Sequence, residues 1–330
     1  MTAKLSMREN LEQFLKPHGT QYDDLRREVD DSFGEPRLVV AAGSVLQGFG
    51  NSASDVDLHA VVDDGRVTDF HVSFHDLGFS VDVNYVEETW IKDAATRPHT
   101  APRTRDQWKD EQRRLTQLCR FTLGLPLAGR ADWFTWREDA ARRFADHAAW
   151  WWRAEALRFR TAAEILTTGN PLLAAQRYCD AGLAVLDCIA AQGDEAYVGT
   201  KWLGLKLHRI GRDDLLERYD RFLALPPRAD DAGDYLSSAA TDIAGLTADW
   251  GLPDDPVVCV APAPGTEVWK VRNQHLVQRW GLYGLELSPD SAEEPVADAV
   301  TWSGRLSSLP DATRQLLLGG LLWLAVVEED

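Results

Sequence analysis

The chain has 330 residues, of which 45% are hydrophobic and 26% are charged, a composition typical of a globular protein with two or three domains. Its formal net charge is −17 and no block of Lys and Arg stands out. This argues against a nucleic acid as partner, because nucleic-acid affinity comes mostly from neutralised phosphates. The four cysteines lack C-x-x-C spacing and the N-terminal segment lacks a signal-type apolar core, so we expect a reduced, cytoplasmic protein.

The first hundred residues combine helical and strand patterns. Residues 5–33 place apolar side chains at helical spacing on both sides of a Pro-His-Gly break, which predicts helices. Three short runs then predict strands. They are residues 36–43, which end in glycine, residues 55–64, which end in two aspartates followed by glycine, and residues 79–88, which alternate apolar and polar side chains.

The middle of the chain, from about residue 105 to 250, has a helical pattern. One helix is expected to stop at Gly-Asn-Pro, and the next to begin with that proline and end at Gly193, because proline suits a first turn and glycine a helix end. Further helices are expected over residues 197–211, 213–225 and 233–251. These segments together predict an all-helical bundle.

The last segment, residues 253–330, is expected to form a small α+β unit. Residues 266–287 alternate like a hairpin and precede an expected pair of helices. The apolar run at residues 316–327 is shorter than the ~20 residues that a membrane-spanning helix needs, so we expect a buried helix and no membrane partner. The unit suits a winged-helix-like or peptide-recognition module; the alternative is an extension that packs on the bundle.

The stretch GSVLQGFGNSASDVDLHAVV, residues 43–62, contains the most informative side chains. Residues two apart in a strand point to one face, so Asp55 and Asp57 should project together, and Asp82 on a later strand could join them. Asp76 is the alternative to Asp82. Clustered carboxylates repel one another, and Mg²⁺ relieves that repulsion while keeping sites for phosphate oxygens.

The Gly-Ser pair before these aspartates predicts a phosphate site. Gly43 lets the backbone approach a phosphate, and the Ser44 hydroxyl and nearby N–H groups can donate to it. A pair of metal ions beside it could stabilise the attacking and leaving oxygens of a displacement at phosphorus. The two parts together predict one site for a nucleoside triphosphate.

The pattern resembles that of a known superfamily. Gly43-Ser44, ten intervening residues, Asp55-Val56-Asp57 and an isolated Asp82 resemble the signature of the DNA polymerase beta-type nucleotidyltransferases, in particular the small-molecule branch with aminoglycoside and lincosamide nucleotidyltransferases. The resemblance covers residues 36–88. It implies a mixed-sheet catalytic domain, expected over residues 1–108, followed by an acceptor-binding helical bundle, expected over 109–252. Together with the small domain expected over 253–330, this predicts an α+β fold in three parts.

The resemblance also implies an activity. A nucleoside monophosphate group would move from a nucleoside triphosphate, with ATP as the first candidate, to a hydroxyl or similar group of a small metabolite or antibiotic, releasing pyrophosphate. In that pattern Asp55 and Asp57 bind Mg²⁺, Gly43 and Ser44 bind the triphosphate, and Asp82 is a third ligand or the acceptor's base. One alternative is a protein or peptide acceptor docked on residues 253–330. Another is a non-catalytic module that senses nucleotide or binds a partner, against which the intact aspartates argue.

Four further residues of the helical segment are candidates. Lys201 and Lys206 could each reach the triphosphate or the departing pyrophosphate, and Lys201 is the preferred candidate. The alternative is that both lie on a solvated helix face. Asp180 and Asp187 share one helix face, where either could orient the acceptor or serve as its base; the alternative is a surface carboxylate.

Three consecutive tryptophans, residues 150–152, cannot share one helix face. At least one of them is therefore expected to meet a neighbouring domain, a ligand or a partner. The eight histidines form no H-x-x-x-H cluster, so no zinc site is expected.

Overall fold

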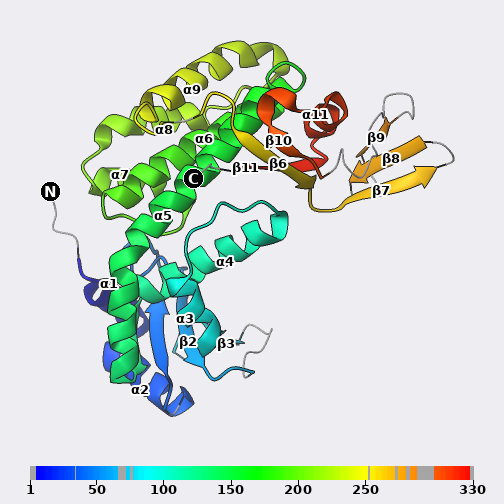
Figure 1. The fold of residues 1–330 in the computed structure, drawn as a ribbon. Helices are drawn as coiled ribbons and strands as arrows, with labels where there is room; N and C mark the ends of the chain where they lie inside the picture. Colours follow the sequence, from blue (N-terminus) through cyan, green and yellow to red (C-terminus); the bar gives the residue numbers. More distant parts are fainter. Residues whose placement is uncertain are drawn as a thin grey trace. The chain divides into compact units, whose positions relative to one another are not determined.

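The computed structural model shows an α+β protein with a mixed sheet and many helices (Figure 1). It describes residues 5–33, 35–65, 72–74, 77–251, 253–271, 274–279, 283–287 and 301–327. The chain forms two compact units. Unit 1 comprises Met1–Pro98, Gln112–Ala148 and Asp194–Trp202, and unit 2 comprises His99–Glu111, Ala149–Gly193 and Leu203–Asp330.

These units differ from the expected division at residues 108 and 252. The reason is that the chain returns to unit 1 after leaving it. The strand β5 (Leu125–Gly129), inside the segment expected to be all-helical, pairs with the strand β1 (Leu38–Ala42). Its sequence, LPLAG, contains proline and glycine and does not alternate apolar with polar side chains. Only its pairing with β1 therefore identifies it as a strand.

The sheet of unit 1 has five strands in the order β3-β4-β2-β1-β5. The strands β2 (Val56–Val62) and β4 (Val81–Glu87) are parallel, and every other neighbouring pair is antiparallel. The strands β1, β2 and β4 confirm the three predicted from the sequence, whereas β3 (Val72–Phe74) was not predicted. Because β2 and β4 are parallel, the first residues of both strands lie at the same end of the sheet.

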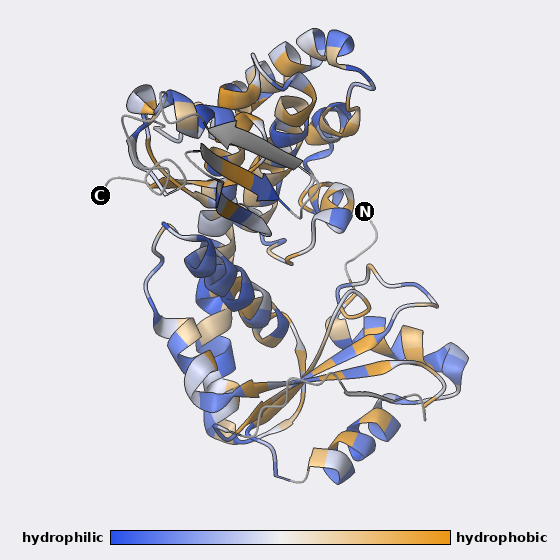
Figure 2. Ribbon diagram, turned by 90° about the vertical axis from the view of Figure 1, so that its right-hand side faces the viewer, coloured by the Kyte–Doolittle hydropathy of each residue, from blue (hydrophilic) through white to orange (hydrophobic). Residues whose placement is uncertain are grey.

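Helices cover both faces of this sheet. Leu11 of α1 (Met7–Leu15) and Leu25 of α2 (Tyr22–Phe33) share one core with β-strand side chains such as Val39. On the other face, the His59 ring of β2 lies 5.9 Å from the Phe121 ring of α4 (Arg105–Thr122). Burial on both faces explains why all five residues of β1 are buried. Figure 2 shows hydrophobic and hydrophilic residues mixed along the strands of unit 1.

Two arginines donate hydrogen bonds to backbone carbonyls at the ends of helices. Arg137 of α5 (Ala131–Leu166) donates to the carbonyl oxygens of Phe121 at 3.0 Å and Thr122 at 3.1 Å, beyond which α4 ends. Arg114 of α4 donates to the carbonyl of Ala94 at 2.6 Å, in α3 (Glu88–Thr96). Terminal carbonyls of a helix lack intrahelical partners, so these bonds fix α4 against the elements on either side of it in unit 1.

The helices of unit 2 pack around α6 (Pro171–Gln192). Asn170 caps α6 by accepting the N–H of Leu173 at 3.3 Å, Pro171 lies in the first turn, and the helix ends at Gly193, as the sequence predicted. The core around it includes Val185 and residues of the later helices. Those helices are α7 (Leu203–Arg209), α8 (Leu216–Leu223) and α9 (Ala232–Leu246), each preceded by a 3₁₀ turn: η2 (Thr200–Trp202), η3 (Asp213–Leu215) and η4 (Ala229–Asp231).

The three consecutive tryptophans all contact residues of their own unit. Trp150 stacks on His99 with ring centroids 5.1 Å apart, Trp151 lies 6.0 Å from Trp108, and Trp152 packs against the helical core. The expected contact with a neighbouring domain, ligand or partner is therefore not needed to explain them. Across the described ranges, no helix combines the length and apolar character needed to cross a bilayer.

The C-terminal part of unit 2 contains two three-stranded sheets. One has the order β10-β6-β11 and the other β7-β8-β9, in which β7 and β8 form the predicted hairpin. Their bounds are β6 (Val257–Pro262), β7 (Thr266–Val271), β8 (Gln274–Arg279), β9 (Tyr283–Leu287), β10 (Ser303–Arg305) and β11 (Leu322–Val327).

The predicted buried helix over residues 316–327 is wrong. The helix α11 (Asp311–Leu318) ends before Gly319, and β11 pairs antiparallel with β6. Gly320 has φ +68°, a left-handed conformation that ends a helix and that glycine adopts without strain. In the described part of residues 253–330, α11 is the one α-helix, so the expected helix pair is not found there.

Candidate active site

Three aspartates gather at one end of the sheet in unit 1. Asp57 of β2 and Asp82 of β4 are direct neighbours in the parallel pairing of these strands. Asp55 directly precedes β2. One ligand oxygen from each carboxylate lies within 4.8 Å of those of the other two, and Asp55 is exposed while Asp57 and Asp82 are half-buried. The structure thus brings together the three residues that the sequence singled out as candidate metal ligands.

Strand alternation explains why these carboxylates share a face. Val56 and Leu58 of β2 and Val81 of β4 belong to the core that faces α1 and α2. Neighbouring residues in a strand point to opposite faces, so Asp57 and Asp82 project to the face covered by α4. The hydrophobic pattern of the strands therefore fixes the position of the acidic cluster.

The donor set of this cluster fits Mg²⁺. It offers three carboxylate oxygens, which are hard ligands, and leaves other coordination positions to water and phosphate oxygens, as Mg²⁺ prefers. The cluster contains neither cysteine nor histidine, the ligands typical of structural zinc sites. Three like charges this close are unfavourable without a cation, so the arrangement is one that a divalent ion would stabilise.

A tight loop, residues 43–50, lies against the cluster. Gly43 has φ +100°, and a Cβ placed on it would lie 2.7 Å from Oδ2 of Asp57. The Ser44 carbonyl accepts the N–H groups of Phe49 at 2.9 Å and Gly50 at 3.0 Å, which closes the loop on itself. Only glycine can both adopt this backbone conformation and leave room for the carboxylate.

Two side-chain hydrogen bonds hold the loop in place. Asn10 of α1 donates through Nδ2 to the Leu46 carbonyl at 2.9 Å. Gln47 donates through Nε2 to the carbonyl of Leu123, just after α4, at 2.7 Å. Anchoring at both positions keeps Gly43 and Ser44 beside the aspartates without requiring a ligand.

Arg120 of α4 is a member of the site that the sequence did not indicate. Its Nη1 lies 3.6 Å from Oδ2 of Asp57 and donates to the Tyr197 hydroxyl at 2.9 Å. Burial opposes ionisation of Arg120, yet Tyr197 and Asp57 outweigh it and leave its pKa raised, while burial raises the pKa of Tyr197. The guanidinium therefore stays charged and partly neutralises the cluster. Arg120 and Tyr197 lie far along the chain from Asp57, so no local pattern could have identified them.

Lys201 lies in the segment of unit 1 that follows Tyr197. It is exposed on η2, with Nζ 4.9 Å from the centroid of the Trp202 ring. That ring stacks on Phe49 of the loop, with centroids 5.3 Å apart and planes within 11°. The structure thus places Lys201 one aromatic ring away from the loop, in the same unit as the aspartates.

The other candidates from the helical segment belong to unit 2. Lys206 and Asp187 form an ion pair in which the side chains are 1% and 0% exposed. Burial raises the pKa of Asp187, and Lys206 opposes this rise. Asp180 is half-buried and paired with Arg177 at 2.8 Å. The geometry therefore favours a structural role for Lys206 and Asp187, while Asp180 is more accessible. Asp76, the alternative to Asp82, lies outside the described residues.

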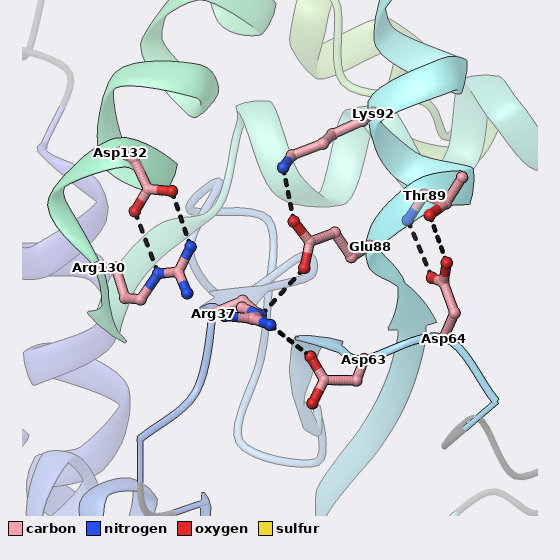
Figure 3. Close-up of polar contacts among 8 residues, drawn as sticks. All are labelled: Arg37, Asp63, Asp64, Glu88, Thr89, Lys92, Arg130 and Asp132. Carbon is pink, nitrogen blue, oxygen red and sulfur yellow. Dashed lines mark hydrogen bonds and ion pairs between the residues drawn. The ribbon is translucent and has the colours of Figure 1, made fainter.

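The acidic residues at the other end of β2 and β4 form a separate network. Figure 3 shows these contacts for Arg37, Asp63, Asp64, Glu88, Thr89, Lys92, Arg130 and Asp132. Arg37 lies 2.6 Å from Asp63 and 3.0 Å from Glu88, so these carboxylates already have a cation. The aspartate pair after β2 is thus a structural counterpart to the pair at its start, and it provides a matched control for it.

Comparison with known proteins gives little beyond this geometry. No family model matches the sequence, and no curated protein matches it. One solved structure that is similar is the crystal structure of a nucleotidyltransferase-like protein from Exiguobacterium sibiricum, with 13% sequence identity, a TM-score of 0.30, and coverage of 79% of this chain and 95% of the other. At that TM-score and identity the similarity by itself identifies neither a shared fold nor a shared activity.

Proposed function

We propose that unit 1 is a Mg²⁺-dependent nucleotidyltransferase that moves a nucleoside monophosphate from a nucleoside triphosphate to a hydroxyl of a small-molecule acceptor, such as a metabolite or antibiotic. The observation that carries the proposal is the convergence of Asp55, Asp57 and Asp82 beside the Gly43-Ser44 loop. A carboxylate cluster next to a backbone turn that begins with glycine suits a metal-bound triphosphate.

In this proposal some residues bind the metal ion and others bind the phosphates. Asp55, Asp57 and Asp82 would hold Mg²⁺, which when bound neutralises phosphate charge and stabilises the oxygens that attack and leave. Gly43 and Ser44 would donate to the terminal phosphates. ATP is the first candidate donor, and Lys201 is the candidate cation for the departing pyrophosphate.

The reaction replaces a phosphoanhydride link of the triphosphate by a phosphate ester link to the acceptor. The acceptor oxygen forms a bond to the α-phosphorus, the bond from that phosphorus to the bridging oxygen breaks, and pyrophosphate leaves with the electron pair. The acceptor's proton passes to a carboxylate. Proximity within the cluster supports Asp82 as a third ligand, and the role of base remains its alternative.

A calorimetric titration with each of the four nucleoside triphosphates plus Mg²⁺ tests the proposal. We expect one triphosphate to bind the parent protein, and an Asp55→Asn/Asp57→Asn variant to lose that binding. Release of pyrophosphate with candidate acceptors then measures turnover, which we expect to fall at least ~100-fold in the variant.

The control variant is Asp63→Asn/Asp64→Asn, which removes two carboxylates at the opposite end of the same strand. It should fold less stably because Asp63 pairs with Arg37, yet bind triphosphate like the parent. Equal loss in both variants would show that the effect is structural. Binding without turnover for any acceptor would instead support a non-catalytic module that senses nucleotide.

One observation favours a peptide or protein as an alternative acceptor. The strand β7 lies at the edge of its sheet, and its Val268 and Trp269 side chains are 44% and 52% exposed. An exposed apolar edge strand suits the addition of an extended peptide. Mass spectrometry of peptides incubated with triphosphate would detect a nucleotide adduct, and Trp269→Ser should reduce it while leaving triphosphate binding unchanged. Unchanged labelling in this variant would remove β7 as the docking edge.

A further inference from the structure

Arg120 connects the acidic cluster to a segment from far along the chain. Its Nη1 lies 3.6 Å from Oδ2 of Asp57 and donates to the Tyr197 hydroxyl at 2.9 Å. A charge-assisted hydrogen bond between nitrogen and oxygen spans about 2.7–2.9 Å, so the distance to Asp57 is longer than such a bond. The hydrogen bond of Nη1 therefore goes to the tyrosine, and the contact with Asp57 is an attraction between opposite charges.

The oxygen of Asp57 that Arg120 approaches also lies against the loop. A Cβ placed on Gly43 would be 2.7 Å from this Oδ2, so the same atom is close to both Gly43 and Arg120. Asp57 is also one of the three carboxylates that would hold Mg²⁺. Two cations at one carboxylate repel each other. A metal ion held by Asp57 would therefore weaken the attraction between Asp57 and Arg120.

Much of the hydrogen-bonding capacity of Arg120 is left for a ligand. A guanidinium has five N–H donors on three nitrogens, and Nη1 is the one nitrogen of Arg120 that makes a hydrogen bond to the part of the chain that the structure describes. The side chain is 24% exposed, so ligand oxygens can reach it. Phosphate oxygens suit it, because the planar guanidinium donates to them through two parallel hydrogen bonds.

Aromatic contacts place Arg120 near the loop that would bind phosphates. The Tyr197 ring lies 5.9 Å from the ring of Phe49, and the N–H of Phe49 donates to the Ser44 carbonyl at 2.9 Å. Because Gly43 and Arg120 are close to the same oxygen of Asp57, a phosphate bound at the start of the loop is within reach of the long arginine side chain.

We propose that Arg120 exchanges one anion for another when the site binds its ligands. It neutralises Asp57 before the ligands bind, and it binds a phosphate oxygen of the triphosphate once Asp57 holds the metal ion. This inference rests on the proposed function, because it assigns Arg120 to the same triphosphate site. Arg120 thus weakens the binding of Mg²⁺ alone, by competing for Asp57, and strengthens the binding of the triphosphate that accompanies the metal ion.

Calorimetric titration of the full chain tests this on the parent and on Arg120→Met. The ligands are Mg²⁺ alone, and then ATP, GTP, CTP and UTP in saturating Mg²⁺. We expect Arg120→Met to bind Mg²⁺ alone about fivefold or more tighter, and to bind the triphosphate that the parent binds about tenfold or more weaker. General damage to the site would weaken both ligands, so the opposite signs distinguish the exchange from a structural role. Unchanged or weaker binding of Mg²⁺ alone, or parent-like triphosphate binding, would overturn the proposal.

Two further variants separate the charge of Arg120 from its shape and position. Arg120→Lys keeps the charge without the planar fork, so it should bind Mg²⁺ alone like the parent and retain only part of the triphosphate affinity. Arg113 of α4 also lies over an aromatic ring, 4.6 Å from the centroid of Trp90, but about two helical turns, or about 10 Å, from Arg120. Arg113→Met should change neither affinity by more than about twofold. Equal effects of Arg113→Met and Arg120→Met would contradict a specific role for Arg120.

The parent protein distinguishes the exchange from the triphosphate site itself. If the parent binds a triphosphate and Asp55→Asn/Asp57→Asn loses it, while Arg120→Met binds both ligands like the parent, the triphosphate site stands and the exchange is disproved. If none of the four triphosphates binds the parent in Mg²⁺, the triphosphate site and the exchange are both overturned.

Discussion

At the residue scale, Gly43 sets the space between the loop and the acidic cluster. Gly43→Ala should strain a backbone at φ +100° and push its Cβ against Asp57, lowering triphosphate and Mg²⁺ affinity about tenfold or more and stability by about 1 kcal/mol. The control is Gly19→Ala, where φ is +69° and no atom lies within 4 Å of the added Cβ. It should lose similar stability but no affinity. Calorimetry and denaturant unfolding separate the two effects, and parent-like binding by Gly43→Ala would disprove the close approach.

Arg120 supplies positive charge to the cluster when Mg²⁺ is not bound. Its Nη1 lies 3.6 Å from Asp57, so Arg120→Met should leave three carboxylates without this cation and destabilise the metal-free protein by about 1 kcal/mol or more. Mg²⁺ should then raise the Tm more in the variant than in the parent, because it relieves a larger repulsion. Tyr197→Phe, which keeps the guanidinium, should show a smaller change. An equal Mg²⁺ effect in parent and Arg120→Met would show that the charge of Arg120 does not act on the cluster.

At the scale of elements, the buried pair Asp187–Lys206 joins α6 to α7. Lys206→Met should destabilise the protein by about 3–5 kcal/mol, because it leaves a buried carboxylate without its cation. Removing both charges, as in Asp187→Leu/Lys206→Met, should restore most of that loss.

The same variant should show a defined pH dependence. Burial raises the pKa of Asp187 above its ordinary value, and loss of Lys206 removes the influence that opposes this rise. A carboxyl whose folded-state pKa is raised takes up a proton on folding, so Lys206→Met should be most stable at low pH and lose stability as pH rises from about 4 through the raised pKa. Denaturant unfolding of the single and double variants at several pH values measures this, and a pH-independent difference between them would contradict it.

At the scale of the whole molecule, the excess of negative charge opposes folding. The chain has 52 acidic and 35 basic side chains, a difference of 17, and such self-repulsion is screened by salt. Raising NaCl from low to moderate concentration should therefore raise the Tm by about 2 °C or more. Sucrose, which is uncharged, controls for exclusion of solute from the surface. A fall in Tm with NaCl would mean that attractive ion pairs outweigh the repulsion.

The sequence by itself determined the local features of this protein. Apolar alternation and glycine predicted β1, β2 and β4, and Gly-Asn-Pro predicted the boundary between α5 and α6. The spacing of Ser44, Asp55 and Asp57 and the polar position of Asp82 were sufficient to propose the acidic cluster, because strand alternation alone sets the face on which a side chain lies.

Only the tertiary structure decided which distant segments complete these features. The strand β5 has no strand pattern of its own and exists through its pairing with β1. The run ending at Val327 is apolar enough for a helix, but Gly320 and the pairing with β6 make it a strand. Arg120 reaches Asp57, and Tyr197 reaches Arg120, from elements with no sequence relation to Asp57. Pairing and long-range ion contacts depend on the arrangement of the folded backbone, which local periodicity does not encode.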